Sequence, residues 1–315
     1  MGLVLGRNRF RRLDSGNFWR GPVDDHGHLH GQGTVRLAAS DDSTISGNFV
    51  HGLLQGPGRH MAADGYCRIY EGQYVNGRRE GQGQDGEGYT GDWHNGLRHG
   101  IGKLETTKFT YKGGFVAGEM TDENANISYS RRNVSHSEPD WYEGPVLNGK
   151  CHGKGYLKYG GTISYYDGDF VDDLKHGKGR MVLDTITDVY RYVGDYRYDK
   201  PHGSGVEHKG NYVYKGDFVE GKRHGNGKML LRFPDLYNYY TLRLKRTHDH
   251  AQLVHFAISI EGEWWEGEPQ NKVIVEYGFG KHNVANGVVA LKTGKTVTFD
   301  EFIQSQVEGA IASND

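Results

Sequence analysis

Histidine offers the most chemistry in this sequence, which contains 17 histidines among 315 residues. Imidazole side chains bind metal ions, transfer protons and respond to pH near neutrality. Several share one position, directly before a Gly-x-Gly sequence: His30, His99, His152, His176, His202 and His224. Because a place in a recurring pattern selects these residues, we interpret them as structural residues whose hydrogen bonds bridge turns.

A second histidine cluster lies outside that pattern and consists of His248, His250 and His255. This cluster lacks the cysteine or carboxylate partners of a familiar zinc site. We therefore predict that the protein has no metal site and needs no cofactor.

Two glycine-rich segments have spacings found in phosphate-binding loops. The segment from Gly81 to Gly86 fits a dinucleotide fingerprint, but that fingerprint needs a helix after it, and a further hairpin is expected here. Gly294-Lys-Thr296 matches the end of a phosphate loop, yet Val289 stands where the first glycine of that loop belongs. The sequence also has no Gly-x-Ser-x-Gly nucleophile motif. We predict no catalytic and no cofactor-binding residues, and hence no enzyme.

Charge and composition exclude further classes of protein. The 38 Lys and Arg residues nearly balance 40 Asp and Glu residues, which argues against a nucleic-acid partner. No segment approaches the roughly 20 apolar residues of a membrane span. Cys67 and Cys151 are too few for a disulfide framework. We expect a soluble, cytoplasmic protein.

Basic residues recur just before the patterned histidines, and we name them the basic turn residues: Arg78, Arg79, Arg98, Lys150, Lys175, Lys200, Lys222 and Arg223. One interpretation is a solvated surface that keeps a repeat soluble and protects exposed edges. The other is an exposed edge for an anionic partner, whose affinity falls as salt screens it. Strand positions carry a matching acidic row, at Asp92, Asp169, Asp195 and Asp217.

These residues belong to an internal repeat that also explains the 49 glycines. The segment from Tyr70 to Gly83 aligns without a gap with Tyr89 to Gly102. The frame also fits residues 142–155, 166–179, 192–205 and 214–227, with a variant at 45–58 and weaker copies from Gly21, Gly113 and Gly262. A count of the first framework glycine of each copy indicates about ten units. The repeat therefore decides the fold prediction for most of the chain.

Each unit is predicted to be a β-hairpin. Alternation places Tyr70, Gly72 and Tyr74 on one face of a strand, and Asn76-Gly77 is a turn dipeptide. We expect an aromatic ring of the neighbouring hairpin to lie against bare glycine backbone, so that Gly100→Val would displace a ring. The expected framework residues are Gly72, Tyr74, Gly91, Trp93, His99, Gly100, Gly102, Gly168, Phe170, His176, Gly177, Gly216, Phe218, His224, Gly225 and Gly227.

The predicted fold is an all-β, elongated, single-layer solenoid of about ten stacked hairpins with a short C-terminal helix cap. We assign residues 1–20 to a lead-in, 21–228 to an array of nine units, 229–259 to an insertion, and 260–315 to a last degenerate repeat with the cap. Thr298-Phe-Asp-Glu301 resembles the capping box that opens such a helix.

The pattern Tyr-x-Gly-x-aromatic-x-x-Gly-x-x-His-Gly-x-Gly resembles the MORN repeat, and the resemblance covers about two-thirds of the chain. It implies a non-enzymatic scaffold or adaptor that docks other proteins on a cytoskeletal or ciliary (axonemal) assembly. The alternative that it implies is a peripheral module that binds acidic phospholipids through the basic turn residues. A homo-oligomer could form through the ends or edges of the array.

Overall fold

A computed structural model describes residues 10–38, 42–130, 138–184, 189–232, 257–269, 273–277, 280–285, 288–290 and 296–298. These residues form strands, turns and loops and contain no helix, hence none long and apolar enough to cross a membrane. The predicted all-β array of consecutive hairpins is confirmed. The predicted C-terminal helix lies outside the described residues, as do residues 233–256 of the predicted insertion.

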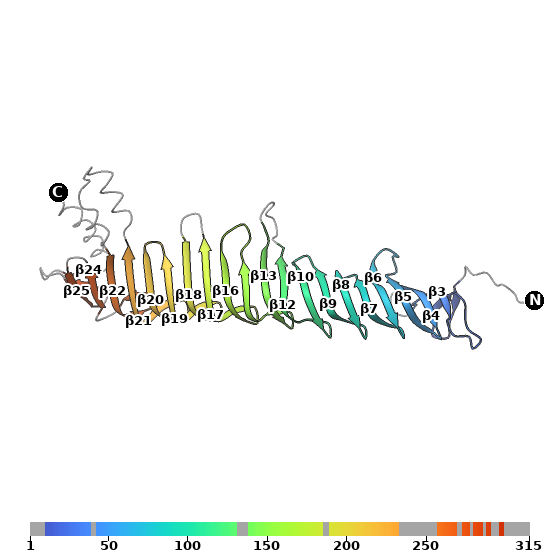
Figure 1. Ribbon diagram of the computed structural model, residues 1–315. Coiled ribbons are helices and arrows are strands. Elements are labelled where there is room, and N and C mark those ends of the chain that lie inside the picture. Colours follow the sequence, from blue (N-terminus) through green and yellow to red (C-terminus); the bar gives the residue numbers. More distant parts are fainter. Residues whose placement is uncertain are drawn as a thin grey trace, which may run out of the picture. The chain divides into compact units, whose positions relative to one another are not determined.

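The chain divides into two compact units, residues 1–153 and 154–315. In the first unit, successive strands from β3 onward pair antiparallel and lie side by side in one layer (Figure 1). Its strands are β1 (Arg11–Arg12), β2 (Phe18–Arg20), β3 (Gly31–Arg36), β4 (Thr44–Val50), β5 (Leu53–Met61), β6 (Arg68–Val75), β7 (Arg78–Asp85), β8 (Tyr89–His94), β9 (Leu97–Glu105), β10 (Phe109–Val116), β11 (Glu119–Met120), β12 (Asp122–Tyr129), β13 (Asp140–Leu147) and β14 (Lys150–Cys151).

The second unit repeats this antiparallel arrangement from β16 onward. Strand β15 (Gly153–Lys158) begins at the last residue of the first unit. The other strands of the second unit are β16 (Tyr165–Val171), β17 (Leu174–Asp184), β18 (Val189–Arg197), β19 (Lys200–Lys209), β20 (Tyr212–Val219), β21 (Lys222–Arg232), β22 (Ala257–Trp265), β23 (Glu268–Pro269), β24 (Val273–Tyr277), β25 (Gly280–Ala285), β26 (Val288–Ala290) and β27 (Thr296–Thr298).

Tight turns of two residues close most hairpins. Asn76 and Gly77 have φ angles of 50° and 74°. Positive φ at both positions defines a turn whose twist matches that of the flanking strands, and it favours Asn and Gly. Asp173 and Asp199 adopt the same conformation, with φ angles of 70° and 68°. The prediction that aspartate replaces glycine at these two turns is confirmed.

Framework glycines pair with one another across the strands and form a continuous glycine row. Within one hairpin Gly91 pairs with Gly102, and between hairpins Gly102 pairs with Gly113. The row in the first unit contains Gly33, Gly47, Gly58, Gly72, Gly83, Gly91, Gly102 and Gly113. The row in the second unit contains Gly168, Gly179, Gly194, Gly205, Gly216, Gly227 and Gly262.

Tyrosine rings cover the glycine row and form the core on one face of each sheet, here called the inner face. We name these rings the tyrosine ladder: Tyr70, Tyr89 and Tyr111 in the first unit and Tyr166, Tyr192 and Tyr214 in the second, all with 0% exposure. The ring of Tyr89 meets Trp93 of its own strand at 5.4 Å and Phe115 of the next hairpin at 4.8 Å, both edge to face. Such pairs contribute about 0.5–1.5 kcal/mol beyond the burial of area.

Over most glycines of the row the ring comes from the same hairpin, so the expectation of a ring from the neighbouring hairpin is wrong there. It is confirmed at Gly58, where a Cβ atom would lie 2.9 Å from the ring of Tyr74 in the next hairpin. A Cβ atom at Gly102 would lie 2.3 Å from Cε2 of Tyr89, which belongs to the paired strand of that hairpin. Tyr89 precedes Gly91 by two residues on the same face, so its ring reaches along the strand over the glycine pair. Elsewhere the contact between hairpins is mainly ring against ring, as between Tyr89 and Phe115.

Candidate functional site

The two glycines of each Gly-x-Gly sequence serve different purposes. In β16 and β17, Gly168 pairs with Gly179 but Asp169 pairs with His176, so Gly177 and Lys178 form a bulge. Gly177 has a φ of 57°, a left-handed conformation that favours glycine. Equivalent φ angles occur at Gly100, Gly203 and Gly225. The first glycine therefore makes the bulge, and the second gives room to the tyrosine ring.

Gly100 thus differs from its prediction, since the atoms nearest to its missing Cβ belong to Asp92 and not to a ring. A Cβ atom at Gly100 would lie 2.7 Å from Oδ2 of Asp92, and its φ is 57°. Gly102, two residues later, carries the Tyr89 ring. The bulge accounts for the difference. Between the pairs Trp93–Arg98 and Gly91–Gly102, β9 has two more residues than β8, so the regular pairing of the two strands is interrupted at Gly100.

The acidic row satisfies backbone groups at these bulges. The carboxylate of Asp169 accepts a hydrogen bond from the N–H of Lys178 at 3.0 Å, and the Tyr166 hydroxyl donates to the carbonyl of Asp169 at 2.9 Å. Equivalent carboxylates accept from Ile101, Ser204 and Asn226 in other hairpins. The bulge interrupts the backbone hydrogen bonds between the two strands and leaves backbone groups that need partners. The aspartate and tyrosine side chains of the repeat supply these partners.

Asp169→Ala is expected to lower the free energy of unfolding by about 1–2 kcal/mol, because the Lys178 amide loses a charged acceptor. Asp169→Asn should cost less, since its amide oxygen can still accept. Urea denaturation of the full chain measures both. Asp167→Ala, at an exposed position of the same strand, is the matched control. Equal losses for Asp169→Ala and Asp167→Ala would contradict this role of the carboxylate.

The basic turn residues divide between the two faces of the sheets. Arg79, Arg98, Lys175 and Arg223 lie opposite the inner-face residues Tyr74, Trp93, Phe170 and Phe218, and we call them the inner cations. Arg78, Lys150, Lys200 and Lys222 lie opposite Val75, Leu147, Arg197 and Val219, and we call them the outer cations. Residues opposite each other in a pair share a face, so the two sets are separated by the sheet.

Inner cations cover the tyrosine ladder. The guanidinium of Arg98 lies 5.2 Å from the centre of the Tyr89 ring and binds the buried Asp85 carboxylate at 2.6 Å. Arg223 lies 5.4 Å from the centre of the Tyr214 ring and binds Glu207 at 3.0 Å. The side chains of Arg98, Lys175 and Arg223 are only 18%, 15% and 17% exposed. The expectation that the whole basic row is exposed is wrong for these three residues.

The outer cations include two lysines that bind carboxylates of the next turn. Lys200 Nζ lies 2.8 Å from Oε2 of Glu220, and Lys222 pairs with Glu266. The hydrogen bond from Lys200 holds the pKa of Glu220 below its ordinary value. Arg78 donates to the side-chain oxygen of Asn95. The charges of Lys200 and Lys222 are therefore compensated by glutamates of the next hairpin.

The patterned histidines contribute their carbonyls and their rings to different contacts. The carbonyls of His99 and His176 accept hydrogen bonds from the hydroxyls of Tyr89 and Tyr166 at 3.3 and 3.4 Å. The ring of His176 instead packs against Tyr198, and that of His224 lies 4.5 Å from the Trp265 ring. Bridging hydrogen bonds thus come from the backbone of these residues.

An exposed row of apolar side chains runs along the outer face, opposite the tyrosine ladder, and we name it the outer ridge. Val75, Val116 and Leu147 each follow a buried inner-face residue and are 49%, 53% and 46% exposed. Leu53 and Leu97 belong to the same ridge in the first unit, and Val171, Leu174, Val219 and Trp265 form its counterpart in the second. The hydrophobic pattern of the sequence contains this ridge, yet the prediction did not single it out.

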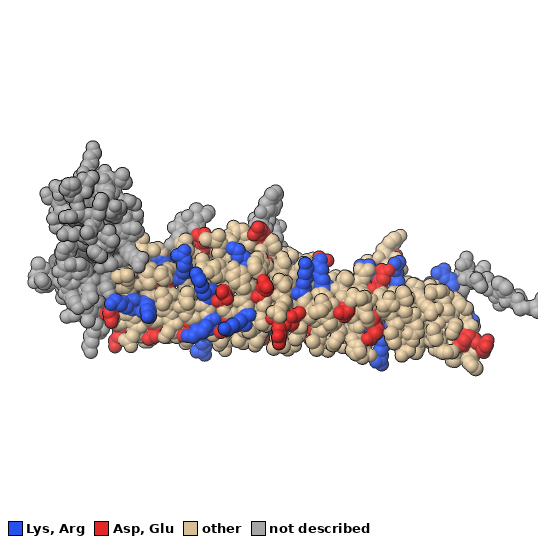
Figure 2. Space-filling model, in the orientation of Figure 1, with Lys and Arg blue, Asp and Glu red and all other residues tan. Residues whose placement is uncertain are grey.

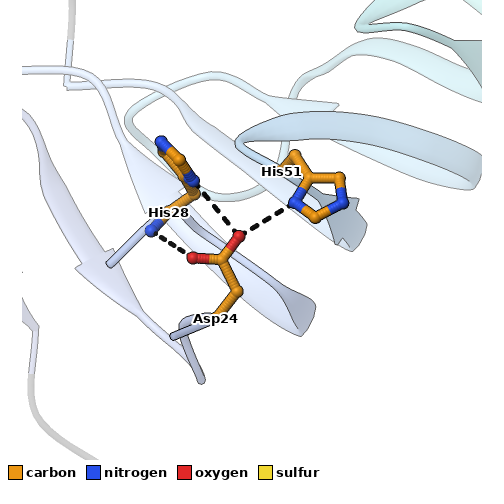
Figure 3. Close-up of side chains that lie close together, drawn as sticks. All are labelled: Asp24, His28 and His51. Atoms are coloured by element: carbon orange, nitrogen blue, oxygen red, sulfur yellow. Dashed lines mark hydrogen bonds and ion pairs between the residues drawn. The ribbon is translucent and has the colours of Figure 1, made fainter. Parts of the chain in front are cut away.

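One polar cluster was missed by the sequence analysis (Figure 3). Oδ2 of Asp24 lies 3.2 Å from Nδ1 of His28 and 2.9 Å from Nδ1 of His51. Burial opposes the ionisation of Asp24, but hydrogen bonds from His51 and His28 outweigh it and hold the pKa well below its ordinary value. The spacing Asp24-x-His26-x-His28 was a local signal, but His51 lies 27 residues away from Asp24.

Comparison with known proteins matches the repeated hairpins to one family. The family model described as "MORN repeat" matches residues 46–65, 70–84, 89–107, 142–161, 166–184, 192–212 and 214–231. Alsin of Rattus norvegicus and alsin of Homo sapiens are each 29% identical over 151 residues, which cover 44% of this chain. The match spans only 8% of the alsin chains. The seven matched segments contain most of the glycine row and the tyrosine ladder, and this chain belongs to the MORN-repeat family.

Proposed function

We propose that this protein is a non-enzymatic scaffold that docks partner proteins along its outer ridge, on a cytoskeletal or ciliary assembly in the cytoplasm. MORN repeats are in general non-enzymatic modules that bind proteins or membrane lipids. The outer ridge is the observation that carries the choice of protein partners. Its side chains are apolar and exposed, and they recur in each hairpin of the first unit from β4–β5 to β13–β14. In the second unit the hairpin of β18 and β19 has Arg197 and Lys200 at these positions.

The spacing of the ridge suits an extended partner segment. Equivalent ridge residues in successive hairpins are two strands apart, which is about 10 Å. Seven residues of an α-helix rise by about 10.5 Å. An amphipathic helix with one apolar residue per heptad could therefore place one side chain against each hairpin.

The charges of the turns favour this proposal over the phospholipid alternative. A basic residue near an acidic membrane contributes about 1 kcal/mol when its charge is free. The inner cations are occupied by aromatic rings and carboxylates, and Lys200 and Lys222 bind glutamates. Figure 2 shows Lys and Arg side chains interspersed with Asp and Glu over the visible face, without a broad basic patch. The interspersed charges leave little attraction for an anionic surface.

A triple substitution of the ridge, Val75→Glu, Val116→Glu and Leu147→Glu, is expected to weaken partner binding at least tenfold. Three apolar anchors would be replaced by charges that a partner would have to desolvate. Proximity labelling with the wild-type chain identifies neighbouring proteins and shows whether they are cytoskeletal or ciliary. Calorimetry with one purified protein from this set then compares its affinity for the wild type and for the triple variant. The exposed positions should tolerate these changes, which thermal melts verify.

The matched control carries Lys200→Glu and Lys222→Glu, which alter the outer cations and leave the ridge intact. This control should keep its partner affinity, and wild-type protein should float only feebly with phosphatidylserine vesicles at physiological salt. Full partner affinity in the ridge variant would refute docking at the ridge. Strong, salt-sensitive flotation of the wild type, lost in the lysine variant, would favour the phospholipid alternative.

A further inference from the structure

We propose that Asp24, His28 and His51 form a binding site for a divalent transition-metal ion, with zinc as the natural probe. The three side chains point toward one another from two separate segments (Figure 3). Among the residues that the structure describes, they are the one group of three or more His, Cys, Asp or Glu side chains whose ligand atoms all lie within 4.8 Å of one another.

The distances from the carboxylate oxygen of Asp24 to the two imidazole nitrogens are close to those in a tetrahedral zinc site. Zinc binds imidazole nitrogen and carboxylate oxygen at about 2.0–2.2 Å, which separates neighbouring ligands of a tetrahedral ion by about 3.3–3.6 Å. Oδ2 of Asp24 lies 3.2 Å from Nδ1 of His28 and 2.9 Å from Nδ1 of His51. An ion can therefore enter between these atoms after small side-chain rotations, and a water molecule completes the fourth position.

Backbone hydrogen bonds hold the carboxylate in the orientation that such a site needs. Oδ1 of Asp24 accepts from the N–H groups of His26 at 3.0 Å and His28 at 2.8 Å. Oδ2 is thereby left facing the two imidazoles. Outer hydrogen bonds orient ligating carboxylates in the same way in known metal sites.

Both segments that carry the ligands have a fixed backbone. The loop that holds Asp24 and His28 is closed by a hydrogen bond from the Asp24 N–H to the His28 carbonyl at 2.9 Å. His51 occupies a two-residue turn with a φ of 47°, and the N–H of the adjacent Gly52 donates to the Leu29 carbonyl at 2.9 Å. The ligand positions are thus set before an ion arrives, which reduces the ordering that binding requires.

The donor set selects the class of metal. Two imidazole nitrogens and one carboxylate oxygen suit zinc, copper and nickel, whereas calcium and magnesium prefer oxygen ligands throughout. The imidazoles of His28 and His51 are 55% and 70% exposed, so an ion has direct access. A bound ion would join the loop before β3 to the turn between β4 and β5. It would therefore add a link between two adjacent hairpins, since β3 pairs with β4.

Isothermal titration calorimetry, in which zinc chloride is added to the full chain, tests the site. One zinc ion should bind with micromolar affinity, and His51→Ala and Asp24→Asn should each weaken that binding at least 100-fold. Cobalt in place of zinc should show the visible absorption of a tetrahedral centre in the wild type, and both variants should lose it. Zinc should also raise the melting temperature of the wild type but not of His51→Ala.

Two controls separate this site from other histidines. His94→Ala removes an equally exposed histidine that binds one carboxylate, Glu80, at 2.8 Å, and it should leave the affinity unchanged. A chain with His248, His250 and His255 all changed to Ala should also retain the site. Circular dichroism verifies that each variant is folded. The proposal is overturned if the wild type binds no zinc, or if Asp24→Asn and His51→Ala bind it as tightly as the wild type does.

Discussion

Alkaline solution is expected to unfold this protein cooperatively, beginning above about pH 10. Burial raises the pKa of Tyr89 to about 12. Burial also raises the pKa values of the other members of the tyrosine ladder well above the ordinary value. The folded state therefore keeps these phenols protonated at a pH at which the unfolded chain loses its protons.

The sign and the size of this effect follow from proton linkage. A group whose folded pKa is raised contributes full stability below its unfolded pKa and loses that contribution as pH rises through the folded value. Each ladder tyrosine should lower the free energy of unfolding by about 1.4 kcal/mol per pH unit above 10. The six ladder tyrosines together give about 8 kcal/mol per unit, which is comparable to the total stability of a typical domain.

Tyrosinate absorbance and far-ultraviolet circular dichroism, followed together against pH, measure this transition. Ionisation of the ladder and loss of strand structure should coincide. The matched variant Tyr111→Phe keeps the ring but removes the hydroxyl that donates to the Gly114 carbonyl at 2.8 Å. It should be slightly less stable at neutral pH and unfold less steeply in alkali. Ionisation of the ladder without loss of strands would show that the rings are not buried as described.

Gly102→Val is expected to destabilise the first unit by about 3 kcal/mol or more, at the upper end of the range for overpacked cores. A Cβ atom there would lie 2.3 Å from Cε2 and 2.5 Å from Oη of Tyr89. Tyr89 is fully buried and is held by Trp93 and Phe115, so its ring cannot swing aside. Chemical denaturation with a fluorescence readout measures the loss.

Gly96→Asn is the matched control for this substitution. Gly96 has a φ of 86°, which asparagine tolerates, and its missing Cβ would meet no atom within 4 Å. Its cost should be a few tenths of a kcal/mol. The double variant Gly102→Val with Tyr89→Leu should be less destabilised than the sum of its parts, because the smaller side chain relieves the clash. Strict additivity would disprove the contact between ring and glycine.

Much of the hairpin was predictable from residues with narrow conformational preferences. Asn76-Gly77 predicts a two-residue turn, because both residues accept positive φ. The alternation of Tyr70, Gly72 and Tyr74 sets which side chains share a face. These are local properties, and the structure contains them as expected.

Other features depend on the register between strands, which local patterns do not contain. The bulge at Gly100 shifts the pairing, so that Arg98 lies opposite Trp93 on the inner face and Gly102 lies under the Tyr89 ring. An adjacent pair such as Arg78 and Arg79 looks like one basic patch in the sequence, yet the pleat sends its members to opposite faces. The contact between Asp24 and His51 likewise requires the pairing of β3 with β4, which brings together residues 27 positions apart.

The two margins of each sheet differ in how much change they can accept. At one margin, turns of fixed length such as Asn76-Gly77 set the bulge, the inner cations and the carboxylate bonds, so the insertion of one residue there would disturb them all. At the other margin the connections between hairpins vary in length, for example from residues 210–211 between β19 and β20 to residues 62–67 between β5 and β6. Evolution can therefore lengthen a loop at the second margin without repacking the core. An engineer could insert a peptide tag there for the same reason.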